Sequence, residues 1–191
     1  MKRKERMQPV RSIFIVLFIL LMLLTTGYAG NLNMDLIDAT KKGDTKAVKS
    51  YLGKGADVNA KDAFGQSALS FAAKYGNMEI AKVLIANGAD VNAKDLMGGG
   101  LALNLAASGG YLNIVEALLS AGAKIDEKGQ SGMTALMWAA YNNHPDVAKL
   151  LISKSADLNL KNNSGNTASH YANKFGGPEI IQIFKEAGAK E

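Results

Sequence analysis

The sequence repeats itself every 33 or 34 residues, and this period constrains the fold more than any other feature. The string GADVNAK occupies residues 55–61 and returns at residues 88–94. Related strings begin at Gly122 (GAKIDEK), Ser155 (SADLNLK) and Gly188 (GAKE). Alanine recurs in step with them, at Ala39, Ala72, Ala106, Ala139 and Ala172. Self-similarity at this period is typical of proteins built from stacked repeats.

Each unit has the pattern of two short helices joined by turns. In residues 62–94, a turn ending at Gly65 precedes Ser67, whose hydroxyl is suited to cap a helix. Gly76 ends that helix, and a second helix carries the apolar stripe Ile80, Val83 and Leu84. No single unit can bury its apolar face alone, so stability must come from stacking. The sequence therefore predicts an all-α solenoid.

The unit G-x-S/T-A-L-x-x-A-A, followed by I-x-x-V/L-L and G-A-D-V-N-A, resembles the ankyrin repeat. The resemblance covers about residues 32–191 and implies antiparallel helix pairs, stacked into a curved solenoid with β-turn fingers along one edge. We divide this region into five repeats, at about residues 32–61, 62–94, 95–128, 129–161 and 162–191.

Two departures from the family pattern carry expectations of their own. Repeat three holds an extra residue within 98–100 and has Leu101 at the cap position, so we expect its finger to be the most mobile. Ser155 replaces a helix-ending glycine, which costs about 1 kcal/mol if the left-handed backbone conformation is kept.

The first 29 residues have the pattern of an export signal. Five basic residues precede the apolar run of residues 13–24, and Gly27 and Ala29 follow at the small positions of a cleavage site. A membrane span needs roughly 17–25 apolar residues, so we predict a cleaved signal peptide over 1–29, with an uncleaved anchor as the alternative. Either reading places residues 30–191 outside the cytoplasm, in the periplasm or secreted, with membrane contact only through an uncleaved segment.

The charge of the chain belongs mainly to this segment. The net charge is +5, but residues 30–191 hold 17 basic and 16 acidic residues, and all three arginines precede residue 30. Arginine is the favoured side chain for forked phosphate and guanine contacts, so we expect no nucleic-acid binding. The absence of cysteine excludes disulfides, thiolate metal sites and a cysteine nucleophile.

The sequence offers no catalytic constellation. His144 and His170 lie in different repeats, and the family resemblance favours structural roles for both. The aspartates Asp57, Asp90 and Asp157 recur with the repeat, as turn residues would. We therefore expect no enzyme activity, no cofactor and no metal. The triplet Asn162-Asn163-Ser164 fits the glycosylation pattern, which matters only in a eukaryotic secretory pathway.

The family resemblance implies that partners contact the finger tips and the first-helix face of the concave side. At such positions the sequence places Gln66 and Met133, together with five aromatic or methionine side chains that packing does not require, which are Phe64, Tyr75, Met97, Tyr141 and Phe175. A row of finger lysines, Lys61, Lys94, Lys128 and Lys161, could meet an acidic partner. The alternatives are that Phe64 and Met97 cover neighbouring fingers and that the lysine row is a solvated edge. Phe71 and Trp138 share a repeat position that we expect to face the core.

These observations predict a monomeric, non-enzymatic protein–protein interaction module outside the cytoplasm. It would inhibit or protect against an exported enzyme or toxin, as some small bacterial ankyrin proteins are thought to do. The alternative is a passive scaffold or stress-support factor of the envelope. An enzyme or a small-ligand binder is the less favoured reading.

Overall fold

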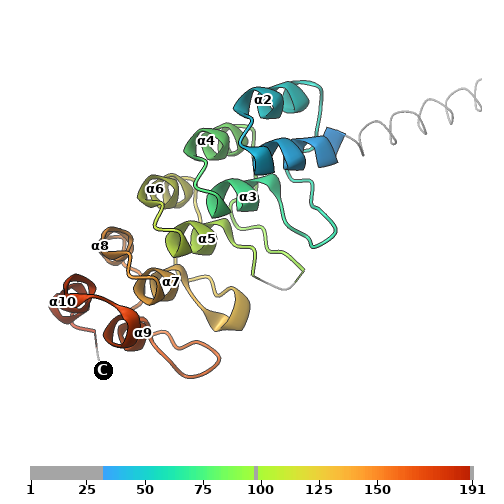
Figure 1. The fold of residues 1–191 in the computed structure, drawn as a ribbon. Coiled ribbons are helices and arrows are strands. Elements are labelled where there is room, and N and C mark those ends of the chain that lie inside the picture. Colours follow the sequence, from blue (N-terminus) through green and yellow to red (C-terminus); the bar gives the residue numbers. More distant parts are fainter. Residues whose placement is uncertain (1–31, 97–98, 190–191) are drawn as a thin grey trace, which may run out of the picture.

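The computed structural model describes residues 32–96 and 99–189, which form a curved row of helix pairs (Figure 1). The predicted signal segment and Met97 lie outside the described residues. A first helix covers residues 32–42, and the described residues contain no strand. The other elements are α2 (Thr45–Gly53), α3 (Ala68–Lys74), α4 (Met78–Ala86), α5 (Ala102–Ser108), α6 (Leu112–Ser120), η1 (Gln130–Gly132), α7 (Ala135–Tyr141), α8 (Pro145–Ser153), α9 (Ala168–Phe175) and α10 (Pro178–Glu186).

The helices form two rows. Helices α3, α5, α7 and α9 lie side by side as an inner row, and α4, α6, α8 and α10 form an outer row (Figure 1). The loops that precede the inner helices project to the same side as fingers. The all-α solenoid expected from the sequence is thus present, while the boundaries of five single repeats stay a prediction.

Local sequence determines where the inner helices begin. The side chain of Ser67 accepts a hydrogen bond from the backbone N–H of Ser70, as predicted, and Thr134 and Thr167 cap α7 and α9 in the same way. Leu101 occupies the cap position of α5 without a side-chain cap bond. Its side chain is buried instead, so apolar packing replaces the missing cap.

Small residues let the inner helices approach one another closely. Ala72, Ala106, Ala139 and Ala172 are fully buried at equivalent positions of the inner row. The outer helices contribute many of the large core side chains, among them Ile80, Leu84, Ile114, Leu118, Leu151 and Phe184, and the inner helices add Leu69, Leu136 and Met137. Each pair therefore buries its apolar face against the next, as stacking requires.

Two of the unusual backbone positions follow from the sequence. Ser155 has φ = 66°, so it keeps the left-handed conformation that glycine supplies in other repeats. Gly65 has φ = 78°, and a Cβ atom there would lie 2.7 Å from the backbone nitrogen of Leu96. The expectation that the third finger is the most mobile stays a prediction, and Met97 and Gly98 of that finger lie outside the described residues.

Candidate functional site

The C-terminal ends of the inner helices present aromatic side chains on the concave side. Tyr75 is 53% exposed, Tyr141 41% and Phe175 46%. The repeat places them there: Lys74, Ser108, Tyr141 and Lys174 are equivalent positions, and Tyr75 and Phe175 share the next position. Three of the four aromatic contact residues predicted from the sequence are therefore accessible at the ends of inner helices.

Four aromatic rings from α7 and α9 form one aromatic cluster, made of Trp138, Tyr141, Tyr171 and Phe175. The Tyr141 ring centroid lies 4.8 Å from that of Phe175, 5.6 Å from that of Tyr171 and 6.0 Å from that of Trp138. Packing of α7 against α9 creates the contacts of Tyr141 with Tyr171 and Phe175, whereas Trp138 and Tyr141 are neighbours on α7. Both Phe71 and Trp138 were expected to face the core. Phe71 is buried as expected, whereas Trp138 is only half-buried.

Tyr171 belongs to the aromatic cluster but was not among the contact residues predicted from the sequence. Its ring stacks on Phe175 at 6.3 Å, and its hydroxyl accepts a 2.7 Å hydrogen bond from Asn162 Nδ2. The sequence pattern could have predicted its place in the cluster. Tyr171 follows Trp138 by one period and precedes Phe175 by four residues, the spacing of neighbours on one helix face.

Two finger tips carry large apolar side chains. Phe64 is 71% exposed and Leu96, in the next finger, is 78% exposed. The Leu96 N–H donates a 3.1 Å hydrogen bond to the Phe64 carbonyl oxygen, which holds the two tips side by side. With most of its surface in solvent, Phe64 offers more contact area to a partner than to its neighbouring finger. Gln66, at the base of the same finger, is half-buried.

Met133 was predicted as a contact residue, but it is buried. It is only 4% exposed and belongs to the hydrophobic core, where its sulfur accepts a hydrogen bond from Asn162 Nδ2. Its burial removes it from the accessible surface. Asn162 is itself buried, so the amide of the Asn162-Asn163-Ser164 triplet is not free for glycosylation in the folded chain.

The four finger lysines are exposed, but most of them already bind the next finger. Lys61 Nζ donates to the Lys94 carbonyl oxygen at 2.9 Å, and Lys128 Nζ donates to the Lys161 carbonyl oxygen at 2.7 Å. The ammonium of Lys94 pairs with the Glu127 carboxylate, and this hydrogen bond holds the pKa of Glu127 below its ordinary value. These contacts indicate that the lysines stabilise the packing of neighbouring fingers rather than forming a row of unpaired positive charges for a partner.

Both histidines make contacts within the fold. His144 Nε2 donates to the Ser108 carbonyl oxygen at 3.0 Å, and the His170 ring lies edge-on to Tyr171. Within residues 32–96 and 99–189, no cluster of three or more His, Asp or Glu side chains could hold a metal ion. None of the helices in this part of the chain has the length and apolar character to span a membrane.

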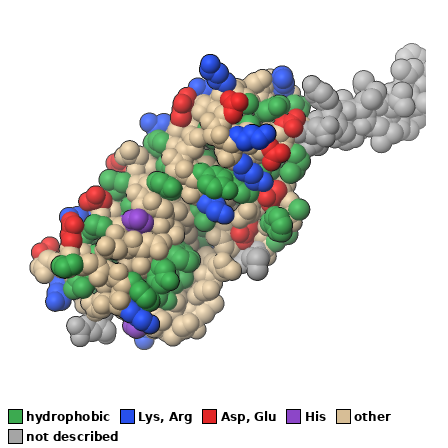
Figure 2. Space-filling model, viewed as in Figure 1, with side chains coloured by type: hydrophobic (Ala, Val, Ile, Leu, Met, Phe, Trp, Pro, Cys, Tyr) green, Lys and Arg blue, Asp and Glu red, His purple; other side chains and the backbone are tan. Residues whose placement is uncertain are grey.

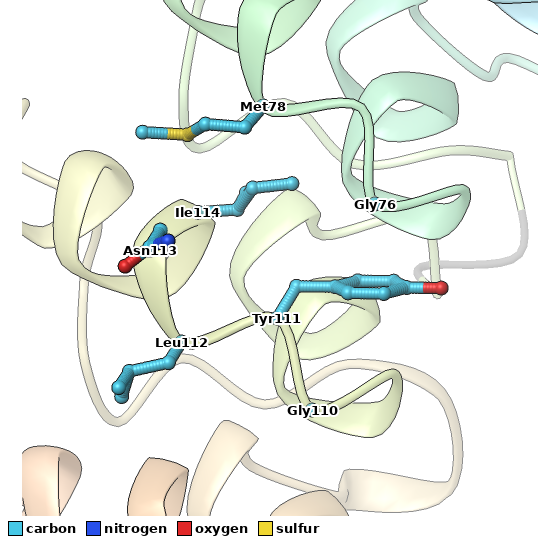
Figure 3. A pocket seen from close by; sticks show the side chains of 7 residues that line it. All are labelled: Gly76, Met78, Gly110, Tyr111, Leu112, Asn113 and Ile114. Carbon is cyan, nitrogen blue, oxygen red and sulfur yellow. The ribbon is translucent and has the colours of Figure 1, made fainter.

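A hollow of about 340 Å³ opens between the turns that join α3 to α4 and α5 to α6 (Figure 3). The Tyr111 ring lies against the Gly76 turn, where a Cβ atom would come within 2.5 Å of it. The remaining lining is apolar or amide in character, and consists of Met78, Gly110, Leu112, Asn113 and Ile114. Tyr111 is therefore the one titratable side chain among the residues that line this hollow.

Comparison with known proteins agrees with this geometry. The family model described as ankyrin repeats (3 copies) matches residues 36–129 and 103–190. A search of curated proteins finds no match. Ankyrin repeats generally mediate binding to other proteins and are typically not enzymes. Because the matched residues make up most of its length, the chain belongs to the ankyrin-repeat family.

Proposed function

We propose that the protein is a monomeric, non-enzymatic binding module that acts outside the cytoplasm and holds a partner protein on its concave face and finger tips. The observation that carries the proposal is the exposure of Tyr75, Tyr141 and Phe175 along one face of the inner helices. Large aromatic side chains left in solvent are the usual anchors of protein interfaces.

The finger tips extend this surface. Phe64 and Leu96 present apolar area beside the concave face, whereas the next two fingers are polar, with Gln130 and Ser131 in one and Asn163 and Ser164 in the other. A partner would therefore contact apolar fingers in the first half of the array and the exposed aromatics of the inner helices, two of which lie in the second half.

Location outside the cytoplasm rests on the pattern of residues 1–29. A basic start, a twelve-residue apolar run and small residues at 27 and 29 are typical of a secretory signal. Cell fractionation with intact-mass measurement tests this: the exported protein should begin at Gly30. A full-length protein in the membrane fraction would favour the anchor, and a full-length protein in the cytoplasm would contradict export.

Within this class, we favour inhibition of, or protection against, an exported enzyme or toxin over a passive role as envelope scaffold. Genes that encode exported lipases or toxins next to this one would support the inhibitor, and the purified protein should then reduce the activity of the neighbouring gene product. An unchanged activity at saturating concentration would favour the scaffold.

Affinity capture from the exported fraction tests the surface itself. The double variant Tyr75→Ala with Tyr141→Ala should keep the helical circular-dichroism spectrum and capture less partner than the wild type. Tyr111→Ala is the matched control, because Tyr111 is also partly exposed but lies at the hollow between helix pairs. Capture by the double variant equal to that of the wild type would contradict the assigned surface.

A further inference from the structure

The inner and outer rows differ in charge. Helices α3, α5, α7 and α9 contain no aspartate or glutamate. The outer helices carry Glu79, Glu116, Asp146, Glu179 and Glu186. Figure 2 shows the result: acidic side chains lie along the outer-helix edge and around the first helix, and the face over α7 and α9 carries basic and apolar groups.

Two lysines of the outer surface form ion pairs, whereas two lysines at the ends of inner helices form none within the described part of the chain. On the outer surface, Lys49 pairs with Glu79 at 3.2 Å and Lys149 pairs with Glu179 at 2.9 Å. On the inner row, Lys74 and Lys174 occupy equivalent positions in the last turns of α3 and α9 and form no ion pair with any described residue. Their positive charges are thus available to a partner.

Each of these two lysines lies beside an exposed ring. Lys74 Nζ is 5.8 Å from the centroid of Tyr75, and Lys174 Nζ is 5.1 Å from the centroid of Phe175. The concave face therefore offers a cation next to an aromatic ring at both ends of the row, with the aromatic cluster adjoining the second. A ligand that matches it needs carboxylates and apolar side chains close together.

We infer that the concave face of α3 to α9 binds an acidic segment of the partner protein, in which aspartate or glutamate alternates with aromatic or aliphatic residues. This inference rests on the proposed function and names the chemistry of its partner. Carboxylates would pair with Lys74 and Lys174, and the apolar side chains would lie on Tyr75 and the aromatic cluster. Complementary charge of this kind raises the association rate and excludes basic competitors.

The spacing of the helices sets the length of that segment. Packed helices lie about 9 Å apart, so the three steps from α3 to α9 span roughly 27 Å. An extended chain covers this distance in about eight residues. A peptide of about twelve residues can therefore reach both lysines at once.

Two competing roles for the lysines lead to different predictions. A lysine in the last turn of a helix also stabilises the negative end of that helix. This role affects stability, but it does not explain why exposed aromatic rings lie beside the lysines or why the inner helices contain no acidic residue. A single-stranded nucleic acid could stack on the rings and pair with the lysines. A protein segment is favoured because the described residues contain no arginine and the family binds proteins.

The only tryptophan of the chain supplies a local reporter. Trp138 is half-buried in the aromatic cluster, with its ring centroid 6.0 Å from that of Tyr141, so a ligand on this face should change its fluorescence. The purified protein is titrated with three twelve-residue peptides of equal phenylalanine spacing that carry glutamate, glutamine or lysine between the rings. We expect the glutamate peptide to bind about tenfold or more tightly than the glutamine peptide and to weaken as salt is added.

Charge reversal tests the residues. Lys74→Glu with Lys174→Glu should weaken the glutamate peptide by about tenfold or more. The matched control is Lys82→Glu with Lys185→Glu, which changes the net charge equally on the exposed surface of α4 and α10 and should have little effect. Equal loss in both double variants, equal affinity for the glutamine peptide, or tighter binding of a twelve-nucleotide single strand would each overturn the inference.

The same variants separate this inference from the proposed function. If the Tyr75→Ala, Tyr141→Ala protein loses the cellular partner while the lysine double variant retains it, the binding surface stands and the acidic partner is overturned. In the opposite case, the wild type binds the glutamate peptide with the expected selectivity, but the Tyr75→Ala, Tyr141→Ala protein captures its cellular partner unchanged. The preference for acidic peptides then stands, and the assignment of the cellular partner to this face is wrong.

Discussion

The side-chain oxygen Oδ1 of Asn59 accepts a 2.7 Å hydrogen bond from the backbone N–H of Asp90, one repeat further along the chain. The Nδ2 group of the same side chain donates to the Gly88 carbonyl oxygen at 3.3 Å. Asn92 repeats this arrangement with Lys124 N–H at 2.9 Å and the Gly122 carbonyl oxygen at 3.1 Å. The asparagine of the recurring string is thus a link between successive repeats, which accounts for its recurrence.

Replacing this link should weaken the stack. Asn92→Ala removes two inter-repeat hydrogen bonds, so we expect the free energy of unfolding, measured in urea, to fall by about 1–2 kcal/mol. The matched control is Asn113→Ala on α6, where the side chain is exposed and makes no hydrogen bond to a described residue. An equal loss in both variants would show that the asparagine contributes nothing through the neighbouring repeat.

Ser155 should be replaceable by glycine with a gain in stability. Its φ of 66° is unfavourable for a residue with a Cβ atom, so Ser155→Gly should raise the free energy of unfolding by up to about 1 kcal/mol. Gly122→Ser is the reciprocal variant, because Gly122 has φ = 89° and a Cβ atom there would have nothing within 4 Å. It should lose a similar amount in thermal unfolding, and a gain in that variant would contradict backbone strain as the cause.

Much of the fold was predictable because each local signal repeats with one period. The cap at Ser67 and the turn glycine Gly76, with φ = 72°, lie where the pattern predicts them. The core stripe is confirmed at Ile80 and Leu84. Periodicity determines helix positions and their register in the stack, since each unit must bury the same face against its neighbour.

The details of the candidate surface could not be predicted in this way. Met133 shares a repeat position with Gln66, which is half-buried, and only packing decides that the apolar side chain turns inward against Asn162. The sequence also places Lys128 and Lys161 in one row without showing that the first side chain reaches the backbone of the second. Both contacts depend on distances between repeats, which the period alone does not give.

The bond between Lys94 and Glu127 predicts a small pH dependence of stability. Lys94 lowers the pKa of Glu127 from its ordinary value of 4.5. The stabilisation is therefore present above pH 4.5 and is lost as the pH falls through the lowered pKa. Both side chains are partly exposed, so the contribution is about 0.2–1 kcal/mol. In thermal unfolding, Glu127→Gln should be less stable than the wild type at neutral pH, with the difference closing under acid. A difference that is constant with pH would exclude the ion pair as its cause.

Met133 and Phe175 should separate folding from binding. Met133 is buried in the core, so Met133→Ala should reduce the free energy of unfolding by about 2–5 kcal/mol and leave the affinity of the remaining folded protein for its partner unchanged. Phe175 is 46% exposed in the aromatic cluster, so Phe175→Ala should weaken partner binding by more than about 1 kcal/mol with a smaller loss of stability. Urea unfolding and titration of the captured partner measure the two quantities independently. The reverse pattern would place the contact surface at the finger base and leave the aromatic cluster as an extension of the core.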